Sequence, residues 1–136
     1  MVKAVETSVL LDVLFDDTQH AGCSIAALRQ AANEGSLVIC DVALAEIVPA
    51  LTPGDAPQFL ADWNLTFVPS SQASALLAGS MFRAYLERGG KRGRVMPDFL
   101  IAAHAQHHAR RLLARDRGYY RDYFTHLQVW DPTASA

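Results

Sequence analysis

The sequence predicts an α/β fold in which a central, mostly parallel sheet lies between layers of helices in a three-layer sandwich. Short apolar runs of strand length alternate with longer stretches of helical composition along the whole chain, which favours strand–helix–strand units. The 136 residues are 51% hydrophobic, which is enough to bury one ordinary core. We therefore expect a single domain over residues 1–132 and a short polar tail at 133–136.

Three strands and four helices are expected in the first half of the chain. Apolar runs of strand length stand at residues 2–5, 37–40 and 65–68. Helical spacing of apolar side chains covers residues 7–14, 21–34, 42–48 and about 56–63. Thr7 and Ser8 open the first of these helices, and Gly35 is a typical stop for the second. Asp41 is the expected N-cap of the third helix, which ends before Pro49.

The second half of the chain continues the alternation. Ser70 and Ser71 are expected to cap a long helix that runs to about Arg88, where two glycines end it. A basic loop over residues 91–94 leads into an alanine-rich helix over roughly 98–109. Short strands are expected at 112–114 and 127–130, with an aromatic turn or short helix at 118–124 between them. In a parallel sheet of this kind, ligands gather at the carboxyl ends of the strands.

Charge is distributed unevenly along the chain, although the formal net charge is only -2. Residues 1–82 carry 2 basic and 9 acidic side chains, whereas residues 83–136 carry 10 basic and 5 acidic ones. A polyanion responds to the local field, so the basic C-terminal half is suited to hold a phosphate backbone. Solvated helix faces explain the same pattern equally well, and charge alone does not separate the two interpretations.

Several function classes are disfavoured by what the sequence lacks. No run of about 18 apolar residues is present, and the N-terminal residues lack the apolar core of a signal peptide, so we expect a soluble, cytoplasmic protein without a membrane partner. Cys23 and Cys40 fit neither a metal knuckle nor a redox pair, and both are expected to be buried thiols. The glycines near residue 90 lack the spacing of a nucleotide-binding loop.

Three histidines on one expected helix, His104, His107 and His108, raise the question of a zinc site. No glutamate in the HExxH arrangement accompanies them, and the helical period turns His104 and His108 away from the side on which Asp98 lies. We therefore expect no histidine metal site.

Four acidic residues are expected at one edge of the sheet: Glu6, Glu46, Asp98 and Asp116. Each follows a strand or lies near the start of a helix at the carboxyl ends of the strands. Clustered carboxylates repel one another, and a divalent cation with a preference for oxygen ligands, Mg²⁺ or Mn²⁺, is their natural neutraliser. Purely structural roles are alternatives for two of them, because Asp98 also suits a helix N-terminus and Asp116 also suits a turn. Glu46 interrupts an otherwise apolar helix, so we expect it to be buried with a partner.

Four segments that contain these acids resemble the PIN domain, and VapC-type toxins in particular. They are VETSVLLD (residues 5–12), LAEI (44–47), MPDFLIAA (96–103) and LARDRGYY (113–120). Their order and spacing cover nearly the whole chain. The resemblance implies a PIN-like sandwich and an Mg²⁺- or Mn²⁺-dependent endoribonuclease toxin that hydrolyses RNA phosphodiester bonds. It also implies a cognate antitoxin that neutralises the toxin, and a homodimer.

The resemblance assigns catalytic and metal-binding roles to Glu6, Glu46, Asp98 and Asp116, with the Ser8 hydroxyl as an accessory contact. Helix capping explains Ser8 equally well. Residues expected to contact RNA phosphates are Arg92, Arg94, Arg115 and Arg117. Tyr119 or Tyr120 is available for stacking on a base. The same basic region is also suited to attract an acidic antitoxin segment.

The first motif departs from the family pattern, because Glu6 stands where the family normally has aspartate. The extra methylene displaces the carboxylate by roughly 1.5 Å, and Mg²⁺ is demanding about ligand geometry. The alternative function is therefore a catalytically attenuated PIN module that binds RNA or an antitoxin.

Overall fold

The computed structural model describes residues 2–115 and 118–134. The strands in that part of the chain are β1 (Lys3–Val5), β2 (Leu37–Ile39), β3 (Leu65–Phe67), β4 (Arg111–Leu113) and β5 (Gln128–Trp130). The helices are α1 (Thr7–Leu14), α2 (Ala21–Glu34), α3 (Asp41–Ile47), α4 (Ala56–Asp62), α5 (Gln72–Glu87), α6 (Met96–His108) and α7 (Tyr119–Tyr123), with a 3-10 turn η1 (Val48–Ala50) after α3.

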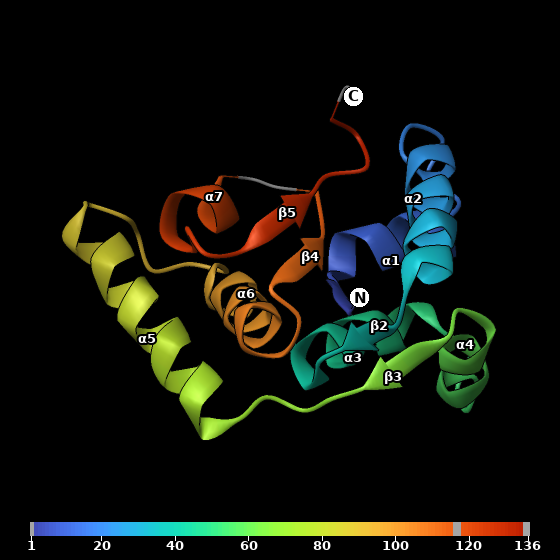
Figure 1. Cartoon of the computed structure of the whole chain (residues 1–136), viewed down its shortest axis with the longest axis horizontal. Coiled ribbons are helices and arrows are strands. Elements are labelled where there is room, and N and C mark those ends of the chain that lie inside the picture. The colour runs from blue at the N-terminus through green and yellow to red at the C-terminus, as the bar shows by residue number, and fades with distance from the viewer. Residues whose placement is uncertain (1, 116–117, 135–136) are drawn as a thin grey trace.

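The strands form one sheet in the order β3-β2-β1-β4-β5, and every neighbouring pair is parallel (Figure 1). The predicted parallel α/β fold is therefore confirmed. The first strand lies at the centre, where Val5 pairs with Leu113 of β4 and Ala4 pairs with Val38 of β2. The chain segment that follows β1 consequently emerges between the ends of its two neighbours.

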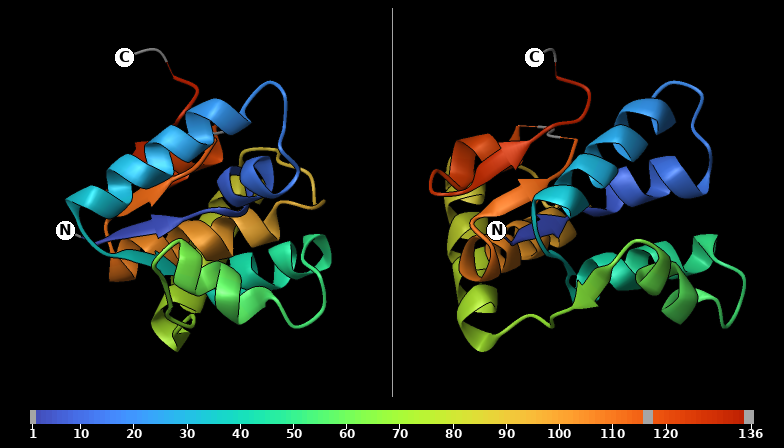
Figure 2. Two further views of the ribbon diagram at one scale, coloured as in Figure 1. Left: turned by 90° about the vertical axis from the view of Figure 1, so that its right-hand side faces the viewer. Right: turned by 45° about the vertical axis from the view of Figure 1, so that its right-hand side comes forward.

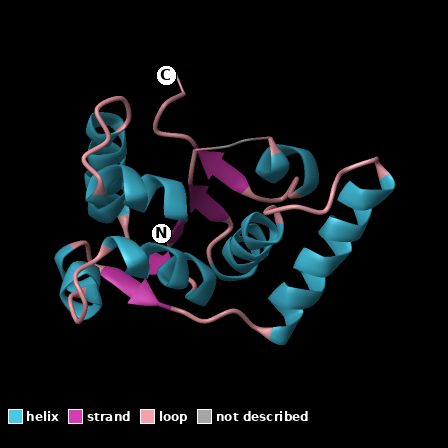
Figure 3. Ribbon diagram, turned by 180° about the vertical axis from the view of Figure 1, so that it is seen from behind, coloured by secondary structure: helices cyan, strands magenta, loops and turns pink. Residues whose placement is uncertain are grey.

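Helices cover both faces of the sheet, as the three-layer prediction requires. Helices α1 and α2 lie on one side, and α5 and α6 lie on the other, so that β1 runs between α2 and α6 (Figures 1 and 2). Figure 3 shows the same arrangement from behind, with the central strands between two groups of helices. Helix α6 turns the fully buried Ala102 and Ala105 inward, and these small side chains let its backbone approach the core closely. Phe99 and Ile101 of the same helix are also buried.

The cap of α3 differs from the sequence prediction. Cys40 is the N-cap, and its Sγ accepts a hydrogen bond from the Ala43 backbone N–H at 3.5 Å. Asp41, the predicted cap, is the first helical residue, and its carboxylate accepts hydrogen bonds from the backbone and hydroxyl of Ser70 at 3.0 and 2.7 Å. The observed N-cap therefore lies one residue before the predicted one. The Asp41 carboxylate instead ties the start of the helix to the segment after β3. The prediction for Ser71 as the cap of α5 is confirmed.

One of the two cysteines differs from the sequence prediction. Cys40 is buried as expected, but Cys23 is exposed, so the prediction of two buried thiols is wrong for Cys23. It lies on the outer side of α2, whereas the neighbouring Ser24 is fully buried and faces inward.

The buried His104 hydrogen-bonds the Val68 carbonyl oxygen through Nε2 at 2.6 Å, so it serves to tie α6 to the end of β3. Among the described residues, no helix is long and apolar enough to cross a membrane.

Candidate active site

The carboxyl end of the central strand places the first predicted acid. The Glu6 backbone N–H donates to the Leu113 carbonyl oxygen at 3.0 Å, which extends the pairing of β1 with β4 by one residue. Glu6 is also the N-cap of α1, so its side chain leaves the sheet exactly where strand changes to helix. The topology therefore fixes Glu6 at the centre of the edge where ligands of parallel sheets gather.

A pocket of about 290 Å³ opens at this edge. It is lined by residues that follow β1, by α3, by α6 and by the segment around α7: Glu6, Thr7, Ser8, Leu11, Glu46, Arg94, Asp98, Arg115, Tyr119 and Tyr120. Three of the four predicted acids thus share one pocket, although 92 positions of sequence separate Glu6 from Asp98. The fourth, Asp116, lies outside the described residues, as does the RNA-contact candidate Arg117.

Glu6 is the most deeply buried of the three acids that line the pocket, with 5% of its surface exposed. One carboxylate oxygen accepts a hydrogen bond from the Ser8 backbone N–H, and the other accepts one from the Tyr120 hydroxyl at 2.9 Å. Burial raises the pKa of the Glu6 carboxyl above its ordinary value, these hydrogen bonds lower it in part, and the charge of Asp98 raises it further. A bound cation would relieve this penalty by favouring the charged form.

The other two acids approach the same pocket from helices. Glu46 is exposed, which corrects the expectation that it would be buried, but it does have the expected partner, because the Thr7 hydroxyl donates to it at 2.6 Å. The open pocket explains the exposure, since the face of α3 that carries Glu46 borders solvent at this point. Asp98 is half-buried in the first turn of α6, where the positive end of the helix dipole favours a carboxylate.

The predicted accessory and RNA-contact residues separate into two groups. Ser8 lines the pocket, but its hydroxyl accepts a hydrogen bond from the Arg115 backbone N–H at 3.2 Å and does not cap the helix. Arg94 and Arg115 also line the pocket, whereas the Arg92 guanidinium lies 5.7 Å from the centre of the Phe82 ring.

The two tyrosines also differ. Tyr120 is 2% exposed, so it is not available to stack on a base as the sequence suggested. The half-buried Tyr119 still lines the pocket.

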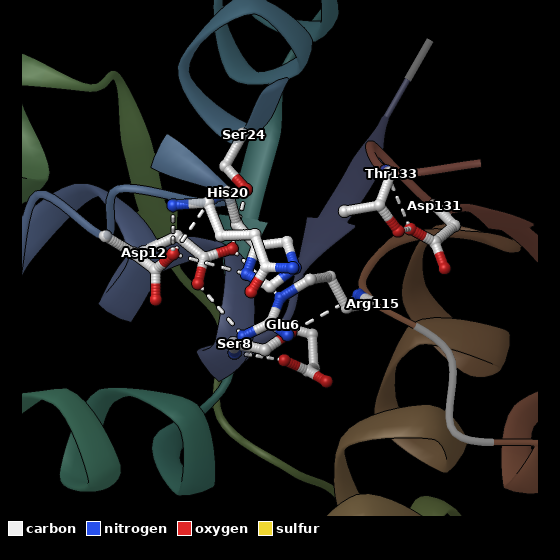
Figure 4. A network of polar contacts seen from close by, with 10 residues as sticks. Glu6, Ser8, Asp12, His20, Ser24, Arg115, Asp131 and Thr133 are labelled. Atoms are coloured by element: carbon white, nitrogen blue, oxygen red, sulfur yellow. Dashed lines mark hydrogen bonds and ion pairs between the residues drawn. The ribbon is translucent and has the colours of Figure 1, made fainter. Parts of the chain in front are cut away.

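A second acidic cluster, which the sequence analysis did not identify, lies beside the pocket (Figure 4). The buried Asp12 accepts hydrogen bonds from the Arg115 guanidinium at 2.9 and 3.0 Å and from the Ser24 hydroxyl at 2.8 Å. Together with Asp17 and His20, Asp12 forms a group whose ligand atoms all lie within 4.8 Å of one another. Because the guanidinium already engages both oxygens of Asp12, the charge that would attract a cation is largely balanced. Asp12 stands four residues after Ser8, so the two share one face of helix α1. This spacing is a sequence feature that could have indicated the position of Asp12 beside the pocket.

The pocket acids fit a hydrated divalent cation. All three offer oxygen ligands, and two of them come from different helices that face the end of β1. The charge of Asp98 acts on the Glu6 carboxyl, so a cation between these two side chains would relieve their repulsion. Mg²⁺ usually keeps several waters and binds only one or two carboxylates directly, so a pocket that is open to solvent suits it.

Comparisons with known proteins identify the family. The family model of the PIN domain matches residues 3–124. VapBC2 from Rickettsia felis bound to a promoter DNA fragment is similar in structure, with a TM-score of 0.71 and 19% identity over 96% of this chain and 100% of that one. VapBC-1 from nontypeable Haemophilus influenzae matches with a TM-score of 0.72 and 15% identity, over 98% of this chain and 100% of that one. FitAcB from Neisseria gonorrhoeae matches with a TM-score of 0.64 and 19% identity, over 97% of this chain and 98% of that one.

Among curated protein sequences, none matches the chain. At such identities the structural matches establish the fold alone, and the family model establishes the family. Because that model spans most of the chain and the segments that it covers hold the acidic pocket, the protein belongs to the PIN-domain family of nucleases.

Proposed function

We propose that this PIN-domain protein is a VapC-type toxin, a metal-dependent endoribonuclease that a cognate antitoxin neutralises. The observation that carries the proposal is the convergence of Glu6, Glu46 and Asp98 on one pocket that Arg94 and Arg115 border. Carboxylates beside arginines suit metal-assisted hydrolysis of a phosphodiester, because the acids can hold a cation and the arginines can hold the polyanionic substrate next to it.

The three acids of the pocket, with Asp116, are proposed to hold Mg²⁺ or Mn²⁺. When bound, the cation would lower the pKa of a water molecule and stabilise charge on the phosphoryl oxygens. Arg94 is exposed and is the best candidate to bind an RNA phosphate. Arg115 contributes less to RNA binding in this proposal, because its guanidinium is already paired with Asp12. Of the two tyrosines, Tyr119 is the candidate for base stacking, because it lines the pocket and is only half-buried.

The remaining assignments concern partners and setting. Structures of VapBC and FitAB proteins share the fold of this chain, which supports an antitoxin as partner. We infer in addition that the protein forms a homodimer, acts on RNA in the cytoplasm, and consists of one PIN-like domain over residues 1–132 with a tail at 133–136. The family match over residues 3–124 supports the single domain.

One observation favours the alternative of an attenuated binding module. Both oxygens of Glu6 already accept hydrogen bonds from the protein, from Ser8 and from Tyr120. A carboxylate has about four lone-pair sites, so two remain for a cation, but the longer side chain of glutamate alters where they point. An attenuated module would bind RNA or antitoxin and leave RNA intact.

The experiment that separates the two functions is cleavage of total RNA by the purified protein in Mg²⁺ or Mn²⁺, with mapping of the new ends. The endoribonuclease proposal predicts discrete cleavage that a chelator abolishes and that Asp98→Asn removes. Glu6→Asp is the matched variant, because it restores the usual family residue. Silence of the natural chain together with cleavage by Glu6→Asp would establish the attenuated module and refute the enzyme.

A further inference from the structure

The family resemblance assigned no role to a contact between Glu6 and Tyr120. The Tyr120 hydroxyl donates to Glu6 Oε2 at 2.9 Å, and the two side chains are 2% and 5% exposed. They approach from opposite ends of the chain, 114 positions apart. We propose that Tyr120 is a positioning residue that fixes the Glu6 carboxylate for the divalent cation; this inference rests on the proposed function.

Packing holds the tyrosine in place before any cation binds. The buried Tyr120 lies in the short helix α7, which begins after Gly118, whose φ of 102° is a conformation that other residues rarely adopt. On the same helix, Tyr119 and Tyr123 place their ring centres 5.9 and 5.6 Å from that of Phe99 in α6. The hydroxyl of Tyr120 is therefore presented to the pocket by a helix that is itself anchored in the core.

Glu6 needs such a partner more than an aspartate would. Glutamate has one more rotatable bond, so its carboxylate samples more orientations unless both oxygens are held. The Ser8 backbone N–H fixes one oxygen and the Tyr120 hydroxyl fixes the other. The longer reach and the hydroxyl are matched, because an aspartate carboxylate would end roughly 1.5 Å short and leave the hydrogen-bonding range of Tyr120.

The matching of the two side chains predicts a specific non-additivity. Removing the Tyr120 hydroxyl releases one oxygen of Glu6 and weakens cation binding in the natural chain. In a chain with aspartate at position 6 there is no such bond to lose, so the same change has little effect. Coupling of this kind is what a double-mutant cycle measures, and loss of stability alone would not produce it.

The test is to measure Mn²⁺ affinity by calorimetry for the natural chain, Tyr120→Phe, Glu6→Asp and the double variant. Tyr123→Phe is the matched control, because it removes a hydroxyl from the same helix at a residue outside the pocket lining. Tyr120→Phe is expected to weaken binding about tenfold in the natural background, which is typical when an outer partner of a metal ligand is lost, and less than about twofold in the Glu6→Asp background. Tyr123→Phe should leave the affinity unchanged.

Two results would overturn the positioning role: an equal loss in both backgrounds, or no loss in the natural one. RNA cleavage is measured on the same proteins to keep the two proposals apart. If the natural chain binds Mn²⁺ and cleaves RNA while Tyr120→Phe matches it in affinity and rate, the positioning role fails and the nuclease stands. If the natural chain does not bind Mn²⁺, both fail.

Discussion

Two groups of acidic side chains lie near the two ends of helix α1, and they differ in how their charge is balanced. In the first, Asp12 is paired with the Arg115 guanidinium through two hydrogen bonds. In the second, Glu6 shares a pocket with two further carboxylates, and burial raises its pKa. The Asp12 group contains an ion pair that stabilises the fold, whereas the pocket is the place where we propose that negative charge is kept for a cation.

Proximity of acidic groups is thus a poor guide to a metal site by itself. The ligand atoms of Asp12, Asp17 and His20 lie within 4.8 Å of one another, yet an ion pair already occupies this group. Because a guanidinium already satisfies Asp12, a cation there would have to displace an arginine. Substitutions in the pocket and substitutions at Asp12 should therefore have different effects on RNA cleavage and on stability.

The largest effect is expected for Asp98→Asn, which removes a charge from the pocket. RNA cleavage should fall by about a hundredfold or more, since loss of even an outer partner of a metal ligand costs about 10- to 100-fold. The fold should be retained, because Asp98 is only half-buried. Initial rates under saturating Mn²⁺, with circular dichroism as a control for folding, provide the measurement. Unchanged rates would remove the pocket from the mechanism.

The next effect is expected on stability and concerns the other group. Asp12→Asn leaves the Arg115 guanidinium, whose side chain is 33% exposed, without its ionic partner. We expect the free energy of unfolding in urea to fall by about 1–3 kcal/mol, a discounted value because the arginine is partly solvated. Mn²⁺ affinity should change little. A large loss of affinity with full stability would reverse the assignment of the two groups.

A smaller effect is expected from Glu6→Gln in the metal-free protein. The pKa of Glu6 is raised in the folded protein, so the protonated side chain stabilises the fold. This contribution is fully present below the ordinary glutamate pKa and is lost as the pH rises through the pKa that Glu6 has in the folded protein. The variant should therefore have a higher Tm than the natural chain near neutral pH and a similar Tm near pH 4, about the ordinary value. Thermal unfolding in a chelator across this range tests the sign. A lower Tm at neutral pH would contradict it.

The smallest effect is expected for Arg94→Ala, which removes one cation from the rim of the pocket. RNA affinity should weaken modestly, and its dependence on salt concentration should decrease by about one phosphate contact. Arg92→Ala is the matched control, since the Arg92 guanidinium lies over the Phe82 ring and outside the pocket lining. Equal changes in the two variants would show that the basic loop acts as a diffuse charge and that the pocket makes no specific contact through Arg94.

Local patterns in the sequence were sufficient to predict the fold and the meeting of Glu6, Glu46 and Asp98 at one pocket. The central strand is an apolar run followed at once by Glu6, and in a parallel sheet that order alone puts the carboxylate at the ligand-binding edge. Asp98 was found in the same way, from its position at the start of an alanine-rich helix. Such predictions succeed because they depend on one segment and the direction of its strand or helix.

The contacts that define the site could not be predicted in this way, because they join distant segments. The pair formed by Asp12 and Arg115 spans 103 positions, and no single segment encodes it. Glu46 was expected to be buried because its neighbours are apolar, yet it faces an opening that exists only once α3 meets the end of β1. The role of Tyr120 likewise depends on the position of a short helix at the opposite end of the chain.

The most direct test of the account is to locate the cation itself. Crystals grown or soaked with Mn²⁺ and measured by anomalous diffraction give the ion's position independently of activity. The account predicts a peak in the pocket, within reach of the carboxylates of Glu6 and Asp98, with the bidentate pair of Asp12 and Arg115 intact. A peak between Asp12, Asp17 and His20 with an empty pocket would contradict it.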